Sequence, residues 1–247
     1  MRVQIVSLFP EYFRGPFDCG PTRIAGEKGA LEVGFTNPRD FTNDQHRTVD
    51  DYPFGGGAGM VLKPEPFVLA IESIRRPDSH VALLSPHGRR FIQDVAREFS
   101  ALPHLVLVCG RYKGVDQRVM QAVDEEVSLG DYILAGGEAA AVTVVEAVAR
   151  LLPGAVEHEE SVHTDSFSAR LLDAPYYTRP REFRGQIVPE VLLTGDHEAV
   201  ARWRRKQALL LTALRRPELL RDEVLTEAER EFLCRELGKE ILNGKNN

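Results

Sequence analysis

Three glycine-bearing loops lie between residues 84 and 137, and they constrain the fold more than any other feature of the chain. They are Leu84–Arg89, Cys109–Gly114 and Leu129–Gly137. The first two directly follow short apolar runs, His80–Leu84 and Leu105–Val108, which are typical of strands buried on both faces of a parallel sheet. Ligands of such sheets bind beyond the carboxyl ends of the strands, and glycine lets backbone groups approach a ligand without a Cβ in the way. The pattern predicts one site for a nucleotide-like ligand.

The common nucleotide-binding fingerprints are absent. The first apolar run, Val3–Phe9, continues into Pro10 without the G-x-G-x-x-G that seats a pyrophosphate on a helix N-terminus. This disfavours a dinucleotide site of the Rossmann type. The segment Gly55–Gly59 has the glycine content of a phosphate loop, but Met60 follows where a P-loop has lysine and then serine or threonine. We therefore do not expect ATP to be bound in the P-loop manner.

Strand-like and helix-like segments alternate through the amino-terminal part of the chain. Such alternation predicts an α/β fold with a mostly parallel sheet wrapped by helices on both faces. The expected segments are Val3–Phe9, Leu31–Thr36, Pro66–Arg76, His80–Leu84, Phe91–Leu102, Leu105–Val108 and Ala139–Leu152. The last segment is a helix that is apolar on most sides and ends before Pro153, so it requires burial in the interior or at a subunit interface.

The carboxy-terminal part is expected to be helical. Residues 155–168 have no helix or strand period, which is typical of a linker, and the proline-rich stretch Pro175–Pro189 follows. A second helix is predicted at Glu227–Leu242 with Thr226 as its N-cap, before a frayed polar tail, Asn243–Asn247. The first helix is expected to bury one face, with Trp203 as a core anchor rather than a base-stacking platform. That face consists of Val200, Trp203, Leu210, Leu211 and Leu214.

Charge is distributed unevenly along the chain. The formal net charge is −6, but residues 1–167 carry −8 and residues 168–247 carry +2. The segment 202–221 alone carries +6, which makes it a candidate surface for contacting RNA phosphates. A solvated helix face is the alternative interpretation. The candidate RNA-binding residues are Arg202, Arg204, Arg205, Lys206, Arg215 and Arg216.

Length and cysteine content narrow the class of protein. At 247 residues with 43% hydrophobic content, the chain can form one large domain or two modest ones. No apolar stretch reaches the roughly 18–20 residues of a membrane span, and no signal-peptide pattern opens the sequence, so a cytoplasmic location is expected. Cys19, Cys109 and Cys234 lack disulfide or zinc-site spacing, and all three are expected to be reduced, with Cys109 buried.

A histidine and glutamate cluster invites comparison with metal sites. His158 and His163 flank Glu159 and Glu160. The two histidines are five residues apart rather than four, which would place them about 140° apart on a helix instead of on one face. The sequence therefore predicts no metal site here.

Several motifs occur in the order and spacing of one known family. They are Ile5–Pro10, Asn37–Phe41, Val49–Asp51, Gly55–Met60, the three glycine-bearing loops, Asp165–Phe167, Tyr177–Pro180 and Arg215–Leu220. Nearly end to end, the chain resembles the bacterial tRNA (guanine-N1)-methyltransferases of the TrmD type, which belong to the SPOUT class. The resemblance implies transfer of a methyl group from S-adenosylmethionine to N1 of guanosine 37 in tRNA, by a homodimer.

The resemblance also implies a particular topology. Residues 1–160 would form a knotted α/β domain that binds S-adenosylmethionine, with a deep trefoil knot over about residues 81–140 whose crossings are the three loops. Residues 161–168 would be a flexible linker, and residues 169–247 a small helical domain that binds tRNA. The implied cofactor-binding residues are Leu84, Ser85, Pro86, Gly110, Tyr112, Ser128, Leu129, Gly130, Asp131, Tyr132, Ile133, Leu134, Gly136 and Gly137.

Methylation of guanine N1 requires a base, because N1 carries a proton at neutral pH. The resemblance places the catalytic aspartate at Asp165, although an aspartate before serine is otherwise typical of a turn or helix cap. Negative charge then develops on N1 and O6, and a fixed cation near O6 would stabilise it. The resemblance assigns that role to Arg150, where a C-terminal helix cation or a snorkelling side chain is the structural alternative.

Lys113 departs from the family pattern. That pattern usually reads C-G-R-Y-E-G, whereas Cys109–Gly114 has lysine in place of glutamate. The charge is reversed where a carboxylate would face the cofactor, so magnesium remains possible as a cofactor but its requirement is in doubt. Two other functions remain open: a knotted methyltransferase that acts on another RNA, for example on ribose, and an RNA-binding module without catalytic activity.

Overall fold

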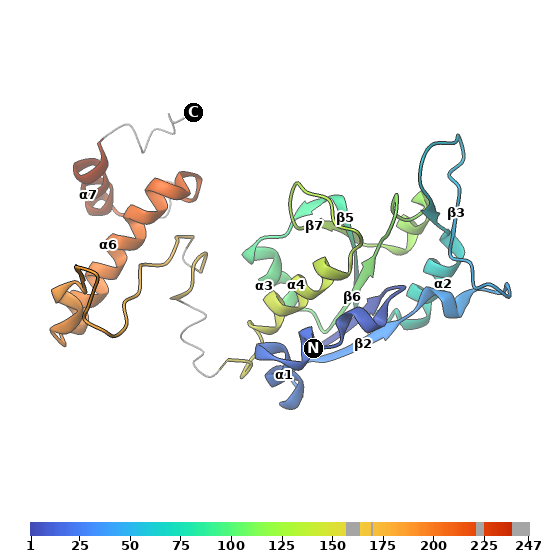
Figure 1. The fold of residues 1–247 in the computed structure, drawn as a ribbon, viewed down its shortest axis with the longest axis horizontal. Helices are drawn as coiled ribbons and strands as arrows, with labels where there is room; N and C mark the ends of the chain where they lie inside the picture. Colours follow the sequence, from blue (N-terminus) through green and yellow to red (C-terminus); the bar gives the residue numbers. More distant parts are fainter. Residues whose placement is uncertain (157–163, 169, 221–224, 239–247) are drawn as a thin grey trace. The chain divides into compact units, whose positions relative to one another are not determined.

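The computed structural model describes residues 1–156, 164–168, 170–220 and 225–238. The chain forms two compact units, Met1–Glu159 and Glu160–Asn247, and each is considered by itself (Figure 1). Among the described residues, no helix is long and apolar enough to cross a membrane.

The first unit is built on a five-stranded parallel sheet with the order β2-β1-β6-β5-β7. The strands are β1 (Arg2–Val6), β2 (Glu32–Thr36), β5 (Ser79–Arg90), β6 (His104–Cys109) and β7 (Glu125–Ser128). The central strand β6 is buried at every residue, which explains its continuous apolar sequence. The predicted parallel sheet is confirmed. The edge strand β7 was not predicted.

Helices cover both faces of this sheet, as predicted. One face carries α1 (Gly20–Glu27), α3 (Gln93–Ser100) and α4 (Glu138–Ala149), and the other carries α2 (Pro64–Ile74) (Figure 1). Neighbouring residues of β1 face the two different cores: Ile5 packs with the α4 side and Val6 with the α2 side. Short elements complete the unit: β3 (Asp50–Asp51), β4 (Val61–Leu62), and the 3-10 helices η1 (Pro10–Phe13), η2 (Pro16–Asp18), η3 (Pro38–Phe41) and η4 (Gln117–Ala122).

Helix α4 is buried within the first unit. Val144, Val145 and Val148 are fully buried and belong to the core shared with α1 and α3, whereas Thr143 and Glu146 are exposed. The sequence predicts burial of this helix either in the interior or at a subunit interface, and the structure shows it packed in the interior of the first unit. The homodimer remains a prediction.

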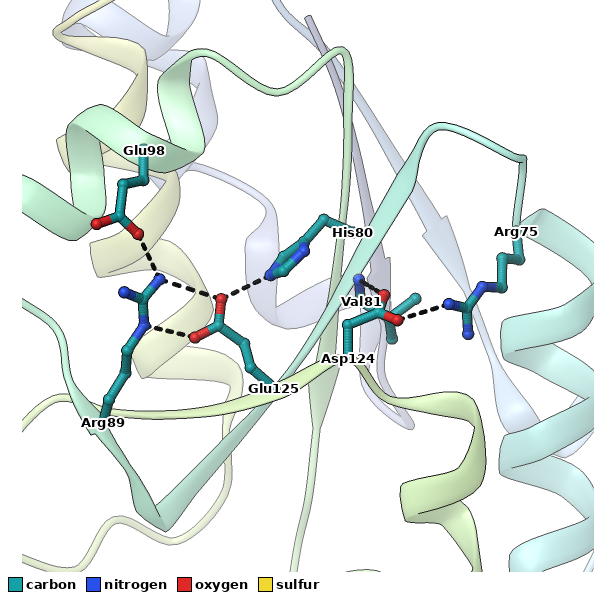
Figure 2. Close-up of polar contacts among 7 residues, drawn as sticks. All are labelled: Arg75, His80, Val81, Arg89, Glu98, Asp124 and Glu125. Carbon is teal, nitrogen blue, oxygen red and sulfur yellow. Dashed lines mark hydrogen bonds and ion pairs between the residues drawn. The ribbon is translucent and has the colours of Figure 1, made fainter.

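The pairing of β5 with β7 is interrupted between Leu84 and Arg89. The carboxylate of Glu125 binds residues of β5 on both sides of this interruption (Figure 2). His80 Nε2 lies 2.6 Å from Glu125 Oε1, and Arg89 Nε donates to Glu125 Oε2 at 2.5 Å. Arg89 Nη2 also donates to Glu98 of α3 at 2.7 Å. His80, Arg89 and Glu125 form the Glu125 clamp, which holds β5 to β7 on both sides of the irregular segment of residues 85–88.

Glu125→Ala is expected to lower the free energy of unfolding by about 1–3 kcal/mol, because it removes the charge-assisted acceptor shared by His80 and Arg89. Thermal and urea unfolding of the whole chain measure this loss. Glu98→Ala is the matched control: it removes one exposed ion pair to Arg89 and should cost no more than about 1 kcal/mol. Equal losses in the two variants would contradict the clamp.

Within the described part of the second unit there are two helices, one hairpin and two 3-10 turns. They are β8 (Glu182–Phe183), β9 (Gln186–Ile187), η5 (Glu190–Leu193), α6 (His197–Arg215), η6 (Pro217–Leu219) and α7 (Glu227–Leu237). Thr226 caps α7 as predicted, in a capping box with Glu229. Helix α7 ends at Leu237, and the φ of 84° at its C-cap, Gly238, departs from helical geometry. The predicted continuation to Leu242 and the predicted frayed tail lie outside the described residues.

The prediction of the buried face of α6 is wrong in part. Leu214 is 63% exposed, and the buried residues of the helix are Ala208, Leu209, Thr212 and Ala213. The Thr212 hydroxyl donates to the Ala208 carbonyl at 2.7 Å and accepts the Leu172 N–H at 2.9 Å. Because both hydrogen bonds satisfy this hydroxyl, a polar residue can face the core in place of a leucine.

Candidate active site

A cavity of about 450 Å³ opens where the three glycine-bearing loops meet, in the size range of small-molecule sites. Thirteen of the fourteen predicted cofactor-binding residues line it: Leu84, Ser85, Pro86, Gly110, Tyr112, Ser128, Leu129, Gly130, Tyr132, Ile133, Leu134, Gly136 and Gly137. Asp131 does not; its side chain is 91% exposed and pairs with Arg90 at 2.9 Å. The lining also includes Lys113, which the family pattern places facing the cofactor, and residues that sequence reasoning missed, among them Arg111 and Glu126.

Two glycines allow the close backbone contacts that shape the cavity. Gly137 N–H donates to the Gly110 carbonyl at 2.9 Å, and a Cβ on Gly137 would lie 2.8 Å from Cys109 Cα. A Cβ on Gly88 would lie 2.2 Å from the carbonyl carbon of Glu126. Both approaches are too close for any side chain, so the loops can meet in this arrangement only with glycine at these positions.

Beside the cavity, a buried ion pair connects three separate segments. Glu138, the first residue of α4, is 1% exposed. Its Oε1 accepts the Ser7 hydroxyl at 2.8 Å, and its Oε2 lies 3.2 Å from Arg111 Nη2. The Arg111 guanidinium also stacks 4.1 Å from the ring centre of Phe9. A buried carboxylate requires such hydrogen-bond and charge partners. In the sequence, the sign that a buried carboxylate is present is a glutamate at the start of a largely apolar helix.

Cys109 is buried at the end of β6, as predicted. Burial raises the pKa of its thiol well above the usual value, and the negative charge of Glu138 raises it further. The group therefore stays protonated at neutral pH and is unsuited to act as a nucleophile.

Lys113 connects the cavity to the glycine-rich Gly55–Gly59 segment. Its N–H donates to the Met60 carbonyl at 3.0 Å, and the next residue, Gly114, accepts the Leu62 N–H at 3.0 Å. The Lys113 side chain extends over Gly59, where a Cβ would lie 3.0 Å from Lys113 Cγ. A cationic side chain therefore lies between the cavity and this segment.

The two candidate catalytic residues belong to different units. Arg150 is half-buried at the C-terminal end of α4, where its N–H donates to the Glu146 carbonyl at 3.1 Å. Asp165 is half-buried in the turn of residues 164–168 in the second unit, where its carbonyl accepts the Ser168 N–H at 3.1 Å. The structure describes each residue within its own unit, and their joint action remains a prediction.

Hydrogen bonds connect the Asp165 turn to an aromatic side chain of the second unit. Asp173 N–H donates to Ser166 Oγ at 3.0 Å, and the Tyr176 hydroxyl donates to Asp173 Oδ2 at 2.8 Å. This hydrogen bond, partial burial and the negative charges of Asp173 and Asp165 raise the pKa of Tyr176. The Tyr176 hydroxyl is therefore a fixed donor that orients its ring.

The candidate RNA-binding residues lie on α6 and directly after it, and they differ in whether their charges are already paired. Arg202 pairs with Glu198 at 3.3 Å, Arg205 with Glu229 at 2.7 Å, and Arg216 with Glu218. The hydrogen bond from Arg205 lowers the pKa of Glu229 and joins α6 to α7. Arg204 and Lys206 instead lie over the rings of Tyr176 and Phe232, and Arg215 completes the predicted set in the last turn of α6.

The histidine and glutamate cluster of residues 158–163 lies outside the described residues. Among the residues that are described, no group of three or more histidine, cysteine, aspartate or glutamate side chains is placed to hold a metal ion.

Comparison with known proteins gives one consistent result. A family model described as tRNA (Guanine-1)-methyltransferase TrmD matches residues 1–222. A relative from Dictyoglomus turgidum is 50% identical over 241 residues, 98% of each chain. One from Carboxydothermus hydrogenoformans is 51% identical over 234 residues, 94% of this chain and 92% of its own. One from Pelotomaculum thermopropionicum is 48% identical over 251 residues, 100% of this chain and 98% of its own. All three relatives carry the name tRNA (guanine-N(1)-)-methyltransferase.

Proposed function

This chain belongs to the tRNA (guanine-1)-methyltransferase TrmD family, and we propose that it transfers a methyl group from S-adenosylmethionine to N1 of guanosine 37 in tRNA. The observation that carries this proposal is the convergence of the three glycine-bearing loops on one cavity. The second unit would bind the tRNA. The enzyme would act as a homodimer in the cytoplasm, as expected from its family.

The cavity suits S-adenosylmethionine, which supplies a methyl group on a positively charged sulfur. Its lining is largely backbone and apolar side chains, and the second and third loops approach as closely as they do only because Gly137 has no Cβ. Backbone groups near Leu84–Pro86, Gly110 and Leu129–Leu134 would enclose the adenine. From the family, about residues 81–140 would form a trefoil knot, with the second and third loops in contact at the Gly137–Gly110 hydrogen bond.

In the proposed reaction, the Asp165 carboxylate takes the N1 proton of the guanine while the methyl group arrives. The Arg150 guanidinium stabilises the negative charge that N1 shares with O6. Ser166 and Asp173 hold the turn that carries Asp165, so the base is positioned by its neighbours within the second unit. Because methyl transfer requires the reacting atoms nearly in line, most of the rate enhancement should come from positioning.

The test is to incubate the full chain with labelled S-adenosylmethionine and a tRNA transcript that has guanosine at positions 36 and 37. Nuclease mapping should place the label at position 37. Label at another position or in another RNA would favour a different RNA methyltransferase. Cofactor or RNA binding without any label would favour a non-catalytic binding module.

Lys113 leads to a separate prediction about metal dependence. We propose that its ammonium group supplies a positive charge beside the cavity. In family members with glutamate at this position, magnesium would supply that charge instead. Activity of the wild-type chain in chelator should then survive better than that of the Lys113→Glu variant. Initial rates with and without chelator measure the difference. Equal losses in both proteins would show that the substitution is neutral.

A further inference from the structure

The second unit has a cavity of its own, of about 470 Å³. It lies among the segment Pro175–Arg181, the turn η5 and the first turns of α6. Its apolar wall includes Leu192, Leu193 and Val200. The volume is in the range that holds small ligands or single residues of a larger one.

The polar side of this cavity is strongly cationic. Arg179, Arg181 and Arg204 line it, and no aspartate or glutamate among the residues that the structure describes does so. None of the three arginines forms an ion pair with a residue that the structure describes. By contrast, Arg202 and Arg205 of α6 pair with glutamates, and so does Arg216 directly after the helix. Lys206 and Arg215 of α6 form no ion pair with a described residue either, but they lie outside the cavity lining. The cavity is therefore the place where three arginines without ion pairs to described residues come together.

Two tyrosines give the same cavity a surface for planar groups. Tyr176 and Tyr177 line it and are 63% and 49% exposed. The Arg204 guanidinium lies 5.4 Å from the ring centre of Tyr176, whose hydroxyl is held by Asp173. Exposed aromatic rings next to unpaired arginines are the combination that binds unstacked bases and their phosphates.

We infer that this cavity binds an unpaired nucleotide of the RNA substrate, with the base against Tyr176 or Tyr177 and the phosphates on Arg179, Arg181 and Arg204. This inference rests on the proposed function, because it takes RNA to be the substrate. The hydrogen bonds through Asp173 and Ser166 connect Tyr176 to the turn that carries Asp165. An RNA nucleotide in the cavity is thereby coupled to the position of the proposed base.

The chain contains one tryptophan, Trp203, and its ring centre lies 6.3 Å from that of Tyr177. Its fluorescence therefore reports on the cavity without any methyl transfer. A short single-stranded RNA should change this fluorescence saturably, and a fully paired RNA duplex of the same strand length should bind more weakly. Equal binding of the duplex would overturn the assignment to an unpaired nucleotide.

Two variants test the two parts of the site. Tyr176→Ala should weaken binding of the single strand about tenfold, because it removes a stacking platform. Arg179→Gln/Arg181→Gln should flatten the dependence of log affinity on log salt by about 0.7 for each phosphate contact that is lost. The matched control is Arg184→Gln/Arg235→Gln, which removes the same charge from arginines outside the cavity lining. Circular dichroism confirms that each variant is folded.

The outcomes separate this inference from the proposed function. In one outcome, the cavity variants and the control show equal losses in affinity for single-stranded RNA and in the slope of log affinity against log salt. The cavity is then not the binding site, even if the wild-type chain methylates tRNA. If only the cavity variants weaken binding while no methyl transfer is detected in any RNA, the site stands and the proposed function fails.

Discussion

Replacing Asp165 by asparagine should lower the single-turnover rate of methyl transfer by about 10²–10⁴, the usual cost of losing a general base. Asparagine keeps the volume of the side chain and some of its hydrogen bonding, but it cannot take up the N1 proton. The affinity for S-adenosylmethionine should barely change, because the cavity formed by the three loops lies within the first unit. Rapid-quench methylation and calorimetry measure the two quantities.

Two further variants complete this test. Arg150→Ala should likewise slow turnover more than it weakens cofactor binding, because its proposed role is to stabilise charge that develops during the reaction. Asp94→Asn removes an exposed carboxylate of α3 and serves as the control for loss of charge. A rate close to wild type in the Asp165→Asn protein would eliminate Asp165 as the base.

Gly137→Val should abolish binding of S-adenosylmethionine. Any Cβ at this position lies 2.8 Å from Cys109 Cα and 3.3 Å from Gly110 N, so the second and third loops must separate. Calorimetry of the purified variant with S-adenosylmethionine measures the loss. Gly137→Ala is the milder version and should weaken binding about ten- to hundredfold, given the usual 1–3 kcal/mol cost of overpacking.

The control for this substitution is Gly26→Ala on α1. A Cβ there would be 3.9 Å from the nearest atom, the Leu31 carbonyl oxygen, and the position does not line the cavity. Thermal unfolding shows whether the Gly137 variants are folded. Unchanged cofactor affinity in a folded Gly137→Val protein would refute the assignment of the cavity.

The parts of the fold that could be predicted are those with a strong apolar period. Strand β6 and helix α4 are visible in the sequence because burial requires almost continuous apolar residues in each. Strand β7 could not be predicted, because Glu125 and Glu126 give it an acidic start. Only the distant His80 and Arg89 make Glu125 compatible with that position.

The candidate site also has some features that the sequence predicts and others that depend on contacts between distant residues. Glycines that follow buried strands predicted the position of the first cavity. That the Lys113 side chain lies over Gly59 depends on the folded structure, and no local sequence pattern reveals it. In the second unit, counting charges along α6 could not distinguish paired from unpaired arginines. Arg205 belongs to an ion pair with Glu229, 24 residues away, whereas Arg204 faces Tyr176.

The most direct test of the central claim is the identity of the methylated nucleoside. The tRNA product should be digested to nucleosides and separated by chromatography with mass detection, alongside standards for 1-methylguanosine and 2′-O-methylguanosine. We expect 1-methylguanosine as the product of the wild-type chain and almost none with the Asp165→Asn variant. Methylation on ribose, or 1-methylguanosine formed equally well without the Asp165 carboxylate, would contradict the proposed function.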